Sequence, residues 1–79
     1  MSNDEINRFI GKNIKLLRKS KGLTLLELAS KVGLSEGNVQ RYESGNIANV
    51  SISVLLKFAS ALNVPPAHIL GWDKDGTIS

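Results

Sequence analysis

The chain has 79 residues, about half the length of a typical single domain, so it can form one compact core but not two. Hydrophobic residues make up 42% of the sequence and charged residues 22%, which is typical of a folded protein and excludes a disordered chain. With no Cys and a single His, the sequence excludes disulfides, a Cys-ligated zinc site and thiol chemistry. We therefore expect no metal and no other cofactor.

The ends of the chain and its charges indicate a location and a class of partner. The N-terminus is acidic, and no apolar run approaches the ~18 residues that a membrane span requires, so we expect a cytoplasmic protein. The net charge is +3, yet residues 8–21 contain six basic residues and no acidic one. This stretch favours a polyanion as partner, although a solvated helix face has the same pattern.

The first predicted element is an amphipathic helix between Asp4 and Lys21, where apolar residues recur every three or four positions. Ser2 and Glu5 fit a capping box at its start, and Gly22 fits its end. Its apolar face is predicted to comprise Ile6, Phe9, Ile10, Ile14 and Leu17. The opposite face, which should meet water or phosphate, comprises Arg8, Lys12, Lys15 and Lys19.

Two short helices are predicted next. The segment Thr24–Glu27 forms a second capping box, which predicts a helix over residues 25–32. Gly33 ends this helix, and a third helix is expected over residues 36–44 after the N-cap Ser35. The two helices would be joined by a tight turn.

The remaining elements complete an all-α chain. After a polar loop, apolar spacing predicts a fourth helix from Ile52 to Leu62, and Pro66 suits the start of a short fifth helix. We therefore expect a compact five-helix bundle in a domain of residues 1–71. Residues 72–79 lack periodicity and are interpreted as a tail or the start of a linker.

The second and third helices satisfy the steric demands of a DNA-binding helix-turn-helix. Such a motif needs a small residue where the helices approach each other, which Ala29 provides, and a residue that tolerates a positive φ at the turn, which Gly33 provides. The positions that must face the shared core are Leu28, Val32, Leu34, Val39 and Tyr42, all apolar or amphipathic. The pattern favours a helix-turn-helix, with a plain structural hairpin as the alternative.

Several short motifs resemble the Xre-type helix-turn-helix family, to which phage repressors belong. They are Gly22-Leu23-Thr24, Glu27-Leu28-Ala29, Lys31-Val32-Gly33, Leu34-Ser35 and the segment 39–45, and the similarity continues through residues 55–64 and 69–73. The resemblance implies a lambda-repressor-like domain that binds a palindromic DNA operator as a dimer and regulates transcription. Many such repressors carry a further C-terminal domain, so the chain is expected to be a stand-alone regulator or the N-terminal part of a longer one.

The third helix supplies the predicted base-reading residues. If it enters the major groove, the side chains that reach base edges are Glu36, Gly37, Asn38, Gln40 and Arg41. Arg41 can donate to O6 and N7 of guanine, Asn38 or Gln40 can pair with adenine, and Glu36 can accept from cytosine. Gly37 either lets the helix lie closer to the bases or is simply tolerated in its first turn. The alternative for the whole set is an ordinary exposed polar face.

A second group is predicted to contact the DNA backbone. Its members are Thr24, Ser35, Ser44, Asn46 and Asn49. Long-range attraction is expected from Lys12, Lys15, Lys19 and Lys21. Relatives usually have a polar residue, often Gln, where this chain has Leu25, so a phosphate contact there would use the backbone or Thr24.

The remaining candidates are assigned structural roles. Glu43 is expected to pair with a basic residue such as Arg18, and Trp72 either packs the last helix onto the first or contacts a partner. Because no nucleophile motif, phosphate-binding glycine loop or metal cluster is visible, we expect no enzymatic activity. The alternative function is a protein-interaction module, such as an antitoxin-like chain whose helix-turn-helix mainly binds a protein.

Overall fold

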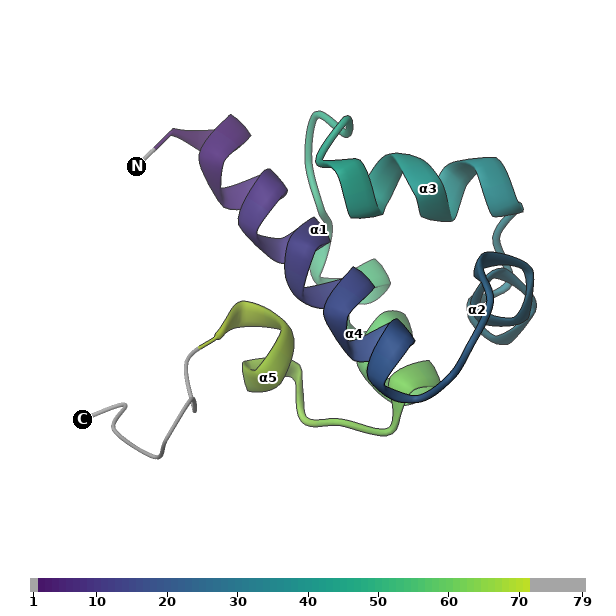
Figure 1. Cartoon of the computed structure of the whole chain (residues 1–79). Coiled ribbons are helices and arrows are strands. Elements are labelled where there is room, and N and C mark those ends of the chain that lie inside the picture. Colours follow the sequence, from purple (N-terminus) through teal and green to yellow (C-terminus); the bar gives the residue numbers. More distant parts are fainter. Residues whose placement is uncertain (1, 72–79) are drawn as a thin grey trace.

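The computed structural model describes residues 2–71, which form five α-helices and no strand (Figure 1). The helices are α1 Asn3–Ser20, α2 Leu25–Val32, α3 Glu36–Ser44, α4 Ile52–Leu62 and α5 Pro66–Leu70. The all-α five-helix prediction is therefore confirmed, with the expected bounds for α2 to α5. The predicted tail over residues 72–79, Trp72 included, lies outside the described residues.

The two predicted capping boxes are confirmed by their hydrogen bonds. At the start of α2, the Thr24 hydroxyl accepts from the Glu27 N–H at 3.0 Å, and the Thr24 N–H donates to Oε1 of Glu27 at 2.8 Å. Ser2 and Glu5 form the same capping box in α1. In both boxes the backbone N–H of the cap, followed by its hydroxyl, holds the pKa of the Glu carboxyl below its ordinary value. Each carboxylate thereby stabilises the first turn of its helix.

The turn between α2 and α3 has the predicted left-handed residue. Gly33 adopts φ +75°, and its N–H donates to the Ala29 carbonyl at 2.9 Å. A side chain at this φ would be strained, which explains the glycine. Ala29 itself is 1% exposed, because α2 packs directly on α3 at this point.

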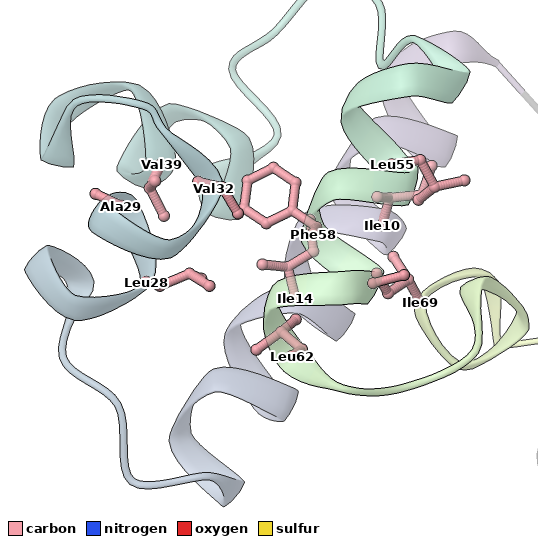
Figure 2. Packing of buried hydrophobic residues seen from close by; sticks show 11 residues of the cluster. Ile10, Ile14, Leu28, Ala29, Val32, Val39, Leu55, Phe58, Leu62 and Ile69 are labelled. Carbon is pink, nitrogen blue, oxygen red and sulfur yellow. The ribbon is translucent and has the colours of Figure 1, made fainter.

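The core lies where α4 meets the other helices, and Phe58 is at its centre (Figure 2). The Phe58 ring points from α4 toward Val32 and Val39, and Ile14 lies below it in this view. Tyr42 of α3 meets this ring edge-on, with 5.3 Å between the ring centroids. The predicted core positions of the helix-turn-helix are confirmed, with Leu34 and Tyr42 half-buried and the others buried.

The predicted apolar face of α1 is wrong at its N-terminal end. Ile6 is 38% exposed and Phe9 is 43% exposed. The buried face of α1 instead comprises Asn7, Ile10, Gly11, Ile14 and Arg18. The helix is rotated so that Gly11 lies against the end of α3, where an added Cβ would come within 2.6 Å of the Glu43 carbonyl oxygen. Apolar spacing could not predict this rotation, because it is caused by a glycine and two polar residues.

Candidate nucleic-acid interface

Helix α3 exposes the predicted base-reading residues on its outer side. Within α3 Val39 is fully buried and Tyr42 is half-buried. Glu43 is half-buried as a whole residue, although its side chain is only 5% exposed. At 100° per residue the exposed positions Glu36, Gly37, Gln40 and Arg41 share an arc of about 140°. Asn38 is exposed but lies about 60° outside this arc, on the side of Tyr42. The structure thus brings four of the five predicted residues onto one face.

Gly37 is not required by packing within the protein. A Cβ built at this position would meet no heavy atom within 4 Å, and its φ lies outside the range that favours glycine. Neither the packing of the protein nor the backbone conformation at this position therefore explains the glycine. At Gly11, by contrast, a Cβ would strike backbone atoms of α3, so packing requires a glycine at Gly11 but not at Gly37.

A buried ion pair fixes the C-terminal half of α3. Nε of Arg18 donates to Oε2 of Glu43 at 2.6 Å, and Nη2 of Arg18 donates to Oε1 at 3.2 Å, so the pairing is bidentate. The Arg18 and Glu43 side chains are only 9% and 5% exposed, and Nη1 of Arg18 also donates to the Leu23 carbonyl at 2.8 Å. The predicted pairing is confirmed. Through Arg18, helix α1 is connected both to α3 and to the loop that precedes α2.

The predicted backbone-contacting residues are all exposed, but their hydroxyl groups differ. Thr24 and Ser35 accept hydrogen bonds as N-caps, and each hydroxyl still has its own hydrogen to donate. The Ser44 hydroxyl instead donates to the Arg41 carbonyl at 3.1 Å, so its hydrogen is engaged within α3. Asn46 and Asn49 lie in the loop between α3 and α4.

One of the four predicted lysines lies next to the exposed face of α3. A cleft of about 180 Å³ is lined by Lys15, Arg18, Leu25, Gln40, Glu43 and Ser44. Lys15 therefore lies on the same cleft as Gln40, while Lys12, Lys19 and Lys21 are exposed elsewhere on or after α1. Leu25 also lines the cleft, and its apolar side chain offers no polar group there.

Sequence reasoning missed the role of Asn7. This residue is 5% exposed, and its Nδ2 donates to the carbonyls of Ile47 and Ala48 at 2.7 and 3.1 Å. A single Asn in a helix rich in polar residues gives no signal of burial.

Between residues 2 and 71 there is no group of three acidic or His side chains that could hold a metal ion.

Residues 14–69 match the model of the HTH_3 helix-turn-helix family, which is more than half of the chain. The chain therefore belongs to this helix-turn-helix family, and the predicted Xre-type resemblance is confirmed. No described helix has both the length and the apolar character needed to cross a membrane.

Similar proteins include an antitoxin and a transcriptional regulator. The chain is 45% identical over 65 residues to the antitoxin PezA of Streptococcus pneumoniae, which covers 82% of this chain and 40% of PezA. It is 40% identical over 68 residues to the transcriptional regulator SinR of Bacillus licheniformis, covering 86% of this chain and 60% of SinR. The chain thus spans less than two thirds of either relative.

A solved structure has the same fold over most of both chains. The crystal structure of the restriction-modification controller protein C.AhdI from Aeromonas hydrophila superposes with a TM-score of 0.74 at 35% identity. The match covers 78% of this chain and 92% of that one. The similarity therefore extends well beyond the two helices of the motif.

Proposed function

We propose that this protein is a sequence-specific regulator of transcription that binds double-stranded DNA through α3. The observation that carries the proposal is the exposed arc of Glu36, Gly37, Gln40 and Arg41 on a helix whose other end is fixed by the Arg18–Glu43 pair. A rigid helix with an unobstructed polar face is suited to lie in the major groove. The regulatory names of SinR and C.AhdI support this assignment.

Base reading is assigned to the arc and to Asn38, which lies beside it. Arg41 donates two hydrogen bonds to guanine, Gln40 or Asn38 pairs with adenine, and Glu36 accepts from the amino group of cytosine. Gly37 leaves room for the DNA between Glu36 and Arg41, since nothing in the protein occupies the space beside it. Each good bidentate contact discriminates against the wrong base by ~1–3 kcal/mol.

Phosphate contacts are assigned to the two edges of this surface. Thr24 and Ser35 lie at the N-termini of α2 and α3, where the helix dipoles favour an anion. Asn46 and Asn49 lie beyond the C-terminus of α3, with Ser44 beside them as a weaker candidate because its hydroxyl hydrogen is engaged. Lysine side chains, above all Lys15, add a sequence-independent attraction.

The proposed target is a palindromic operator bound by a dimer, as in phage-type repressors. Two recognition helices of a symmetric dimer need half-sites about one helical turn apart, ~34 Å. The proposal assigns no enzymatic activity to the chain.

The test is the salt dependence of binding to a duplex selected from a random pool. Bound phosphates release counterions, so log affinity should fall linearly with log salt, with a slope near −5 for about six neutralised phosphates. The selected duplex should also be bound more tightly than a scrambled one. A flat salt response, or equal affinity for the two duplexes, would contradict the proposal.

The second candidate function is a protein-interaction module of the antitoxin type. It is favoured by the 45% identity to PezA and by large exposed hydrophobic side chains, among them Leu26 and Ile52 at 63% and 71% exposure. Under this alternative, the same salt titration would show weak binding without discrimination between duplexes. The salt titration on the selected and scrambled duplexes therefore distinguishes the two candidate functions.

A further inference from the structure

Asn7 is a buried polar residue that the proposed function does not use. It and Arg18 are the two buried polar or charged residues among residues 2–71. Nδ2 of Asn7 donates to two successive carbonyls, of Ile47 at 2.7 Å and of Ala48 at 3.1 Å. Both carbonyls belong to the loop 45–51, which connects α3 to α4 and passes beside α1 (Figure 1).

Neighbouring positions of α1 hold the same stretch of chain. Gly11 lies against the backbone of Tyr42 and Glu43 in the last turn of α3. Gly45 lies so close to Arg8 that an added Cβ would be 2.8 Å from the Arg8 Cα. The chain therefore contacts α1 at Gly11, then at Arg8 and then at Asn7 as it leaves α3. The family match begins only at residue 14, so all three positions precede it.

The hydrogen bonds of Asn7 determine which way two loop N–H groups point. In a planar trans peptide the N–H points opposite to the C=O. Since the carbonyls of Ile47 and Ala48 point at Asn7, the N–H groups of Ala48 and Asn49 point away from α1. Ala48 and Asn49 are exposed, and within residues 2–71 neither N–H donates to another group. Adjacent outward N–H groups are a favourable arrangement for an anion.

We propose that Asn7 is a positioning residue for DNA binding, which holds the loop so that the Ala48 and Asn49 N–H groups and the Asn46 side chain meet one backbone phosphate. This inference rests on the proposed function. The loop contains no helix or strand to fix its peptide planes, so Asn7 supplies that restraint from α1. The ligand is a DNA phosphate, because the loop directly follows the C-terminus of α3.

The test compares two variants of Asn7 with a matched control in the full chain. Asn7→Asp keeps the shape of the side chain, removes its N–H donors and adds a charge. Asn7→Ala removes the whole amide group without adding a charge. The control is Asn13→Asp on the same helix, because Nδ2 of Asn13 donates to the Ile69 carbonyl at 2.7 Å and so holds α5 instead of the loop. Folding of each variant is checked first by circular dichroism.

Affinity is then measured on the selected duplex and on copies with one neutral methylphosphonate at each backbone position in turn. The unchanged protein should lose affinity at the phosphate that meets the loop. Both Asn7 variants should bind the normal duplex roughly 5- to 50-fold more weakly, because hydrogen bonds to a charged group are lost. They should also become insensitive to the methylphosphonate at that phosphate, while the ratio of affinities for selected and scrambled duplexes stays the same.

Asn13→Asp should keep the affinity and the phosphate sensitivity of the unchanged protein. The inference is overturned if folded Asn7 variants bind with unchanged affinity, if they retain the phosphate sensitivity, or if Asn13→Asp loses it equally. It is also overturned if neither Asn7 variant folds, since Asn7 would then be a requirement of the fold. Failure of the unchanged protein to bind DNA is a different result, which removes the proposed function and the inference together.

Discussion

The junction of α2 with α3 and the contact of α1 with the α3–α4 loop hold the two ends of α3 in different ways. At the junction, apolar side chains such as Leu28 and Val39 pack around Ala29, and a left-handed glycine makes the turn. At α1 the contact depends on Gly11 and on the polar side chains of Asn7 and Arg18. One end of α3 is thus positioned by hydrophobic packing, and the other by close backbone approach and buried polar groups.

Among changes at these two contacts, breaking the Arg18–Glu43 ion pair between α1 and α3 should have the largest effect on stability. Arg18→Met leaves the Glu43 carboxylate buried without its partner, which should reduce the free energy of unfolding by about 3–5 kcal/mol. Urea denaturation of the two proteins measures the difference. The double variant Arg18→Met with Glu43→Leu should recover most of the loss, because it removes both charges. An additive loss in the double variant would show that the pairing does not stabilise the fold.

The next effect concerns the two helical glycines. Gly11→Ala places a Cβ against the carbonyls of Tyr42 and Glu43, which should destabilise the protein by ~3 kcal/mol or more. Gly37→Ala is the matched control, because its Cβ meets no atom and alanine favours the helix by up to ~1 kcal/mol. Thermal unfolding should therefore shift in opposite directions. Equal melting temperatures for the two variants would refute the close approach of α1 to α3.

The hydrophobic packing between α2 and α3 is tested at Ala29. Ala29→Leu adds three carbon atoms at a position that is 1% exposed between α2 and α3, which should cost ~1–3 kcal/mol. Ser30→Leu, at the exposed neighbouring position, controls for the added side chain. An unchanged melting temperature for Ala29→Leu would mean that the helices do not meet there.

The smallest effect is the acid dependence of the capping boxes. Because the folded-state pKa of Glu27 is lowered, its contribution to stability is complete above the ordinary pKa of Glu and is lost as the pH falls through the lowered value. Glu27→Gln should therefore lower the melting temperature slightly at neutral pH and approach the unchanged protein in acid. A difference that stays constant between neutral and acid pH would argue against the capping role of the carboxylate.

The parts that sequence could predict are those in which side-chain type determines position. Hydroxyl caps, left-handed glycines and apolar spacing predicted the bounds of α2 to α5 and the core of the motif, and charge complementarity predicted the Arg18–Glu43 pair. The orientation of α1 was not predictable. Ile6 and Phe9 are exposed because Asn7 and Gly11 turn inward, and the partners of those two residues lie more than thirty positions away in the chain.

The candidate site was predictable in part for the same reason. Local helix geometry was enough to predict which side chains α3 exposes, and the exposed arc contains Glu36, Gln40 and Arg41. The loop after α3 has no such periodicity. Its peptide orientations depend on Asn7, and only the structure reveals that contact.

The most direct test of base reading by α3 is a titration of Arg41→Ala and Lys19→Ala against the selected duplex and a scrambled one. Arg41→Ala should weaken binding to the selected duplex by ~1–3 kcal/mol and hardly affect the scrambled duplex, because a guanine contact is lost. Lys19→Ala should weaken both equally, and its effect should shrink as salt rises. Equal losses on the two duplexes for Arg41→Ala would contradict the assignment of α3 as the helix that reads the operator.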